Sequence, residues 1–220
     1  MTILQEIAEE RNTNQPLTEQ AYRNLLRDIL TEKLAPGSKL TESKLSEAYR
    51  LSRTPVREAL RRLENNGLVQ FIPNRGFFVR GISAQEIEDM MKLRADGEIM
   101  AVRWGIERIT EEEMEEFGEI FSHMEFYTRK EDLLKMIDIN KAFHRMIYRS
   151  AHSNLLYNTM LTYQTYSDFC CPSNYFATGF LKHVLEEHRK IYTAYLEKNV
   201  EAGARAMRSH MNRTIHRSIF

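Results

Sequence analysis

Three histidines in the second half of the chain have the residue type and spacing of a metal site. His144 lies in INKAFHRMIY, four residues after Asn140. Four residues correspond to about 400° of an α-helix, so both side chains leave the same helical face. His188 and His210 lie in two later segments with helical patterns, each among apolar or small residues. Three imidazoles and one amide from three helices could surround one ion in a helical bundle. The alternative for each histidine is a hydrogen-bonded core residue.

A second group of residues that could bind a ligand is the run of arginines in LSRTPVREALRRLENNG, residues 51–67. Arg53, Arg57 and Arg61 recur every four residues and predict one basic face of a helix. Like charges at this spacing repel one another unless an anion lies against them. The predicted apolar face of the same helix consists of Val56, Ala59, Leu60 and Leu63. This helix is therefore a candidate anion-binding element, and the alternative is a solvated basic face.

The neighbouring patterns place this helix in a winged helix-turn-helix. Its N-cap is predicted at Thr54, Pro55 is expected at the first helical position, and Gly67 ends the helix. A short helix over residues 41–49 precedes it, and LVQFI, PNRG and FFVR follow as strand, turn and strand. In such a motif the second helix enters the major groove, and the hairpin tip, here Arg75, reaches the DNA backbone or minor groove.

This stretch resembles the N-terminal domain of GntR-family bacterial transcription regulators. The resemblance covers LAPGSKLTESKLSEAYRLSRTPVREALRRLENNGLVQFIPNRGFFV, and its most specific part is SRTPVREALRRLE followed by GLV and PNRGFFV. It implies a homodimer that binds double-stranded, palindromic operator DNA. We expect base-edge contacts from Arg53 and Arg57, and phosphate contacts near Ser52 and Thr54. The full set of expected DNA-binding residues is Ser52, Arg53, Thr54, Arg57, Arg61, Arg75 and Gly76.

Two positions depart from the pattern of this family. Arg50 stands where the turn between the two helices usually has glycine, so a residue with a side chain is expected to adopt a left-handed conformation or to change the turn. Ser43 stands where relatives of the FadR type often have an arginine. Both departures are expected to affect sequence specificity rather than the ability to bind DNA.

From residue 83 onward the pattern is helical throughout. Ser83 to Glu86 and Thr110 to Glu113 fit the capping box, in which two side chains satisfy free N–H groups of a helix start. Six helices are expected, at about 84–107, 111–128, 132–149, 154–169, 181–196 and 199–217. This half resembles the FCD effector domain that accompanies the winged helix in the FadR subgroup of GntR regulators, over about residues 83–217.

The resemblance to metal-binding FCD domains implies a ligand set. Such domains carry an Asp-x3-His pair on one helix and single histidines on the last two, which correspond here to Asn140, His144, His188 and His210. The amide of Asn140 is a weaker ligand than the usual aspartate, so zinc, nickel and manganese all remain candidates for the divalent ion. His123, His152, His183 and His216 have no place in this set and are expected at the surface or in packing.

Arg94 resembles the arginine that faces the effector pocket on the first FCD helix. Its planar guanidinium suits a small carboxylate effector. The alternative is a surface ion pair with Glu98, four residues later on the same helix.

The predicted fold is mainly α, with a leader over residues 1–16, a winged helix-turn-helix over 17–80 and an all-helical domain over 83–217. The chain has a formal net charge of zero over 220 residues, but residues 17–80 hold twelve basic and seven acidic side chains. The predicted DNA-binding part therefore carries +5 and the remainder −5. This asymmetry is typical of a nucleic-acid-binding domain joined to a sensor domain.

Neither a membrane segment nor a secretory signal is expected. No run approaches the roughly 18 apolar residues that span a bilayer, and the first ten residues contain acidic side chains. Cys170 and Cys171 are adjacent and are interpreted as reduced thiols, with a soft-metal or redox site as the alternative. These features predict a cytoplasmic protein located on the bacterial nucleoid.

Two functions of different classes follow. The favoured one is a ligand-responsive transcription regulator without enzymatic activity, in which a carboxylate bound at the metal-bearing domain changes operator affinity. The alternative is a metalloenzyme built on the helical bundle, with the winged helix as a dimerisation module. The sequence does not name the effector, the operator or the metal, and it does not decide between repression and activation.

Overall fold

The computed structural model describes residues 2–5, 16–170 and 180–219. The chain divides into two compact units, one of residues 9–87 and one of residues 1–8 with 88–220. Residues 6–15 of the predicted leader, Cys171 and the rest of the loop CPSNYFATG lie outside the described residues, as does the side chain of His216.

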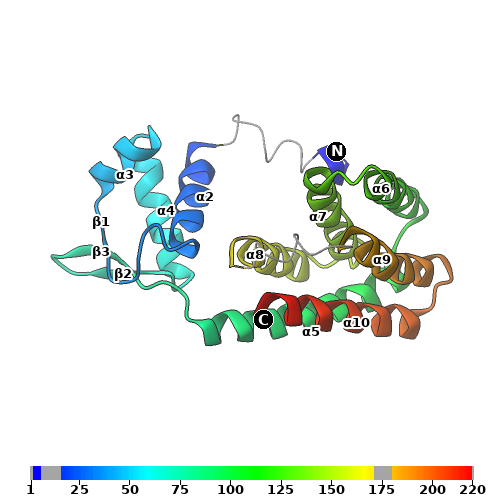
Figure 1. Cartoon of the computed structure of the whole chain (residues 1–220). Coiled ribbons are helices and arrows are strands. Elements are labelled where there is room, and N and C mark those ends of the chain that lie inside the picture. The colour runs from blue at the N-terminus through cyan, green and yellow to red at the C-terminus, as the bar shows by residue number, and fades with distance from the viewer. Residues whose placement is uncertain (1, 6–15, 171–179, 220) are drawn as a thin grey trace. The chain divides into compact units, whose positions relative to one another are not determined.

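The smaller unit is a winged helix-turn-helix (Figure 1). Its helices are α2 (Leu17–Leu30), α3 (Glu42–Tyr49) and α4 (Arg53–Asn65), and its strands are β1 (Lys39–Leu40), β2 (Val69–Ile72) and β3 (Gly76–Val79). The strands form an antiparallel sheet in the order β1-β3-β2. The apolar face of α4 is buried as predicted and packs against α2. The core residues of these two helices include Ala21, Leu25, Leu26, Val56, Ala59, Leu60 and Leu63.

The start of α4 differs from the prediction by two residues. Ser52, rather than Thr54, is the N-cap, and Thr54 and Pro55 lie within the first turn of the helix. The first four N–H groups of any helix lack an intrahelical acceptor, so proline is tolerated at the third helical position as well as at the first. The predicted N-cap was therefore wrong, because proline alone does not fix which position of the first turn it occupies.

Two tight turns position the surfaces of this unit. Arg50 ends α3 with φ 55° and ψ 40°, so the expected left-handed conformation is confirmed. At the hairpin, the N–H of Arg75 donates to the carbonyl of Ile72 at 3.0 Å, and Asn74 between them has φ 62°. Proline at the second position and a left-handed third residue match a type II turn, which holds Arg75 at the tip of the wing.

The described part of the chain from residue 84 onward forms six helices, as predicted. They are α5 (Ala84–Arg108), α6 (Glu111–Arg129), α7 (Leu133–Ser150), α8 (Asn154–Cys170), α9 (Phe180–Leu196) and α10 (Val200–Ile219). Both predicted capping boxes are present: Ser83 and Glu86 exchange hydrogen bonds at 2.8 and 3.2 Å, and Thr110 and Glu113 do so at 3.0 and 3.2 Å. Reciprocal caps of this kind fix where α5 and α6 begin.

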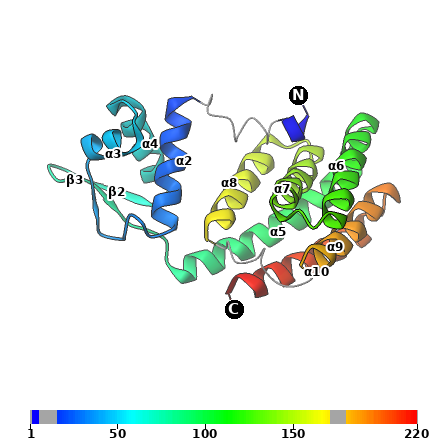
Figure 2. The same cartoon turned by 45° about the horizontal axis from the view of Figure 1, so that its top comes forward.

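The helices of this unit enclose one hydrophobic core. Helix α10 runs beside α5 and packs against α9 (Figures 1 and 2). The approach of α10 to α5 depends on Gly203, because a Cβ there would lie 2.5 Å from Ile106 and 2.9 Å from Val102. Helices α5 and α10 are thereby held close together, and together with α7 and α9 they contribute side chains to the site described below.

Residues 2–5 are part of the helical unit, although the sequence assigned them to a leader. Ile3 is fully buried in the core of that unit, and its N–H donates to the carboxylate of Glu116 on α6 at 2.8 Å. Thr2 and Gln5 cap the turn with reciprocal hydrogen bonds at 3.0 and 3.3 Å. The winged unit is consequently linked to the helical unit at both of its ends in the sequence.

None of the helices in the described ranges combines the length and the apolar character that a membrane span requires.

Candidate metal centre and nucleic-acid interface

Three of the histidines selected from the sequence converge inside the helical unit. His144 from α7, His188 from α9 and His210 from α10 each offer one ring nitrogen, and these atoms lie within 4.8 Å of one another. All three histidine residues are buried, with at most 5% of their surface exposed. The Nε2 atoms of His144 and His188 are 3.4 Å apart. The convergence predicted for these three residues is therefore present.

Each of the three rings uses its Nδ1 atom for another contact. Nδ1 of His188 lies 2.7 Å from the carbonyl oxygen of Val184, which can only accept, so this nitrogen is the donor. Nδ1 of His144 lies 3.0 Å from a carboxylate oxygen of Glu98, and Nδ1 of His210 lies 2.7 Å from one of Glu187. Contacts of this type fix both the tautomer and the orientation of a metal-binding histidine.

This arrangement directs the lone pairs of the imidazoles toward one another. With Nδ1 protonated and the ring neutral, each Nε2 carries a lone pair and no hydrogen. Two such nitrogens at 3.4 Å cannot form a hydrogen bond, so they repel unless a proton or a metal ion lies between them. Burial lowers the pKa of His210 and outweighs the hydrogen bond to Glu187, which raises it. His210 is thus held in the neutral form that metal binding requires, and the triad could hold a metal ion.

Glu98 is the buried anion behind His144. Its second carboxylate oxygen accepts from the Tyr148 hydroxyl and from Arg94, at 3.3 Å in the latter case. Burial raises the pKa of Glu98, but the hydrogen bonds from His144 and Tyr148 and the charge of Arg94 outweigh burial and hold this pKa below its usual value. The carboxylate therefore remains ionised at neutral pH and accepts the proton of Nδ1 of His144.

His210 has an equivalent support. Glu187 is 5% exposed, and one of its oxygens faces His210 while the other accepts from Arg213 at 2.7 Å. Behind two of the three histidines, a carboxylate contacts the imidazole and an arginine contacts the carboxylate. The guanidinium compensates the buried carboxylate in each case, because a buried charge is costly unless it is paired.

The structure places the remaining predicted residues of the site as follows. Asn140 is half-buried on α7, one turn before His144, and its role as a ligand stays a prediction. Arg94 forms the ion pair with Glu98 that was the alternative to an effector role, but the pair is buried rather than at the surface. His123, His152 and His183 are exposed, as expected.

Nearly all of the predicted DNA-binding residues are exposed at the surface of the winged unit. Ser52, Arg53, Thr54, Arg57, Arg61 and Arg75 are all exposed, and Gly76 is half-buried at the start of β3. Arg75 extends from the wing, with its guanidinium carbon 5.4 Å from the centre of the Phe78 ring. By contrast, Arg62 on another face of α4 is bound to Glu19 at 2.7 Å and lies over the ring of Tyr22. Arg53 and Arg61 thus remain exposed on the predicted basic face, whereas Arg57 is paired with Glu42.

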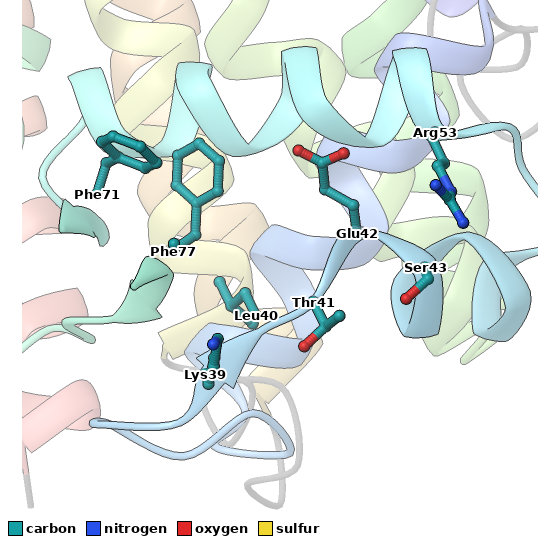
Figure 3. A pocket seen from close by; sticks show the side chains of 9 residues that line it. Lys39, Leu40, Thr41, Glu42, Ser43, Arg53, Phe71 and Phe77 are labelled. Atoms are coloured by element: carbon teal, nitrogen blue, oxygen red, sulfur yellow. The ribbon is translucent and has the colours of Figure 1, made fainter. Parts of the chain in front are cut away.

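A cavity of about 300 Å³ lies beside this face (Figure 3). It is lined by Lys39 to Ser43, by Arg53 and by residues of the wing, Phe71, Gly76 and Phe77. The carboxylate of Glu42 points toward α4, and the side chain of Arg53 descends toward Ser43 (Figure 3). Glu42 binds Arg57 through two hydrogen bonds, a contact that the sequence pattern did not predict.

The residues that the sequence missed are those that support the histidines, namely the acceptors Glu98 and Glu187 and the donor Tyr148. Tyr148 could have been found, because it follows His144 by four residues and shares its helical face. Glu98 and Glu187 gave no such signal, since their imidazole partners lie 46 and 23 residues away in the sequence.

Comparisons with known proteins agree with both halves of the chain. The family described as "Bacterial regulatory proteins, gntR family" matches residues 17–79, and the FCD domain matches residues 89–213. The chain belongs to the GntR family. Like other members of that family with an FCD domain, it is a DNA-binding transcription regulator, and the enzyme alternative loses its support because the relatives are regulators.

Two relatives and one solved structure illustrate the similarity of this GntR regulator to others. The HTH-type transcriptional regulator YdhC of Bacillus subtilis is 29% identical, covering 88% of this chain and 87% of YdhC. The HTH-type transcriptional repressor RspR of Escherichia coli is 28% identical, covering 91% and 88%. The structure of E. coli McbR/YncC matches with a TM-score of 0.71 at 23% identity over 92% of this chain and 96% of that one, and therefore supports the fold.

The buried carboxylate behind His144 yields a prediction. Glu98→Gln should lower the affinity of the full chain for zinc about 10–100-fold, because a neutral amide supports the Nδ1–H tautomer of His144 less well than a carboxylate. Glu88→Gln is the matched control, since it removes the same charge from the same helix but breaks only a surface pair with Lys92. Affinities would be measured by calorimetric titration, after circular dichroism has shown equal helix content. Equal affinities for both variants would mean that Glu98 does not support the site.

Proposed function

We propose that this GntR regulator binds a palindromic operator as a homodimer and senses a small organic acid at a metal ion in its FCD domain. The observation that carries the proposal is the convergence of the ring nitrogens of His144, His188 and His210 at one buried point. The resemblance of the sequence to metal-binding FCD domains supports the same assignment.

The donor set fits a divalent cation. Three neutral imidazoles suit zinc and nickel, and we assign the amide oxygen of Asn140 as a fourth ligand because it lies one turn before His144 on α7. Manganese prefers oxygen ligands, so it is the least favoured of the three ions for this set. When bound, the cation would supply positive charge that attracts a carboxylate, in a site whose own carboxylates are already paired with arginines.

Arg94 is the proposed second contact for the effector. It is 6% exposed and belongs to the same buried cluster as Glu98 and His144. A planar guanidinium can bind a carboxylate through two parallel hydrogen bonds. An effector that binds Arg94 would share it with Glu98, which would connect effector binding to the support of His144.

Homodimerisation follows from the operator that we propose. The two recognition helices of a dimer reach successive major grooves, so a palindromic site matches the twofold symmetry of the protein. The effector would change operator affinity only to the extent that it binds two arrangements of the dimer differently. We propose that the protein represses transcription, because the relative RspR is described as a repressor. We propose that it lies in the cytoplasm, because bacterial operators are located there.

The DNA part of the proposal predicts different roles for two arginines of α4. Arg57→Ala should cost about 1–3 kcal/mol of specific binding and relax the sequence preference, because it removes a base contact. Arg61→Ala should weaken binding less and mainly reduce the dependence on salt, because it removes a phosphate contact. Fluorescence anisotropy on an operator selected from random duplexes would measure both effects. Unchanged affinity of both variants at moderate salt would mean that α4 does not read DNA.

The metal part predicts opposite effects for two substitutions. Asn140→Asp should tighten binding of zinc, nickel and manganese, because it places a charged oxygen on the same helical face with nearly the same side-chain shape. His188→Ala should lose the metal and the thermal stabilisation that binding to the folded state contributes. Calorimetric titration of the metal-free proteins would measure the affinities. If Asn140→Asp had the affinities of the wild type for all three ions, Asn140 would not be a ligand.

A further inference from the structure

The acidic residue at the start of α3 contacts an arginine in the middle of α4. Nε of Arg57 donates to one carboxylate oxygen of Glu42 at 2.8 Å, and Nη2 donates to the other at 2.7 Å. The Arg57 side chain is 55% exposed and that of Glu42 is 24% exposed, so the pair lies at the surface of the winged unit. Glu42 approaches α4 from the edge of the cavity that separates the wing from α3 (Figure 3).

The geometry determines which donors of Arg57 remain available. A guanidinium has five N–H groups, and Glu42 occupies the edge formed by Nε and Nη2. The end formed by Nη1 and the second hydrogen of Nη2 points away from that carboxylate. Two donors side by side at this end match the O6 and N7 acceptors that guanine presents in the major groove.

We propose that Glu42 is a positioning residue for base readout, which holds Arg57 side-on so that its free end meets a guanine. The inference rests on the proposal that Arg57 reads the major groove. An exposed arginine alone samples many rotamers and must be ordered when it binds a base. The two hydrogen bonds to Glu42 order the guanidinium beforehand, so less conformational freedom is lost on the DNA.

The charge of Glu42 also affects affinity. The pKa of Glu42 is lowered first by the hydrogen bonds from Arg57 and further by the positive charges of three arginines of α4. An ionised carboxylate near DNA repels phosphates, which weakens binding to every sequence alike. A uniform weakening leaves the ratio of specific to non-specific affinity unchanged, so this ratio rises only through the base contact that Glu42 strengthens.

The competing interpretation predicts the opposite effect of Glu42 on operator affinity. Glu42 could occupy Arg57 only in the free protein, so that DNA would have to break the ion pair before binding. Removing the carboxylate would then strengthen binding to the operator. The two interpretations differ in the direction of one measurable ratio, the affinity for operator over that for a scrambled duplex.

The experiment uses the full chain and an operator that the wild type selects from a random duplex library. Fluorescence anisotropy at one salt concentration gives the dissociation constants for this operator, for a scrambled duplex, and for operators in which single guanines are replaced by 7-deazaguanine. In the wild type, one such replacement per half-site should weaken binding at least fivefold, because 7-deazaguanine lacks the N7 acceptor. Arg57→Ala should abolish the sensitivity at that guanine.

Glu42→Gln should lower the operator-to-scrambled ratio about tenfold and remove most of the sensitivity to 7-deazaguanine, while binding to the scrambled duplex stays equal or becomes tighter. Adding Glu42→Gln to Arg57→Ala should change the ratio no further, because both substitutions remove one contact. Glu47→Gln is the matched control, since Glu47 is an exposed acid on the same helix, and its ratio should equal that of the wild type.

Three results would overturn the inference in distinguishable ways. If Glu42→Gln keeps or raises the ratio while Arg57→Ala lowers it, Glu42 does not position Arg57. If Glu47→Gln lowers the ratio as much as Glu42→Gln, the effect is one of net charge alone. If Arg57→Ala leaves the ratio unchanged, the assignment of Arg57 to the major groove fails, and the inference about Glu42 fails with it.

Discussion

The helical unit is organised around three imidazoles whose unprotonated nitrogens face one another. Neutral rings could hydrogen-bond among themselves if their tautomers differed, but each Nδ1 has an acceptor of its own in Glu98, Val184 or Glu187. All three rings are thereby fixed in the tautomer that leaves Nε2 without a proton. Burying three facing lone pairs without a cation is unfavourable, so this arrangement favours a cation.

The same constraint explains why charged residues lie inside an otherwise apolar bundle. Glu98 and Glu187 accept from the histidines, and each needs a positive partner, which Arg94 and Arg213 provide. Four helices are thus tied to one point, so a ligand that changes the contacts there acts on the packing of α5, α7, α9 and α10 together. In the winged unit, a carboxylate that holds an arginine by both oxygens again fixes the direction of a donor group, which we propose meets a base of the operator.

Much of this structure could be predicted from the sequence because the relevant signals are local. Capping residues such as Ser83 and Thr110 indicated helix starts within a residue, and the apolar or small residues around His188 and His210 predicted the burial of these two histidines. The strand β1 was missed, since two residues give no periodic pattern and depend on pairing with β3. The support of His144 and His210, like the Glu42–Arg57 pair, depends on which helices meet, which no local pattern specifies.

X-ray absorption spectroscopy of the zinc-loaded full chain tests the central claim about the helical unit most directly. Multiple scattering distinguishes imidazole from other light ligands, so it counts the histidines that bind the ion. The orientation of the three Nε2 atoms predicts three imidazoles at about 2.0–2.1 Å from zinc, completed by oxygen ligands. A spectrum that required fewer than three imidazoles would contradict the assignment of His144, His188 and His210 to one metal site.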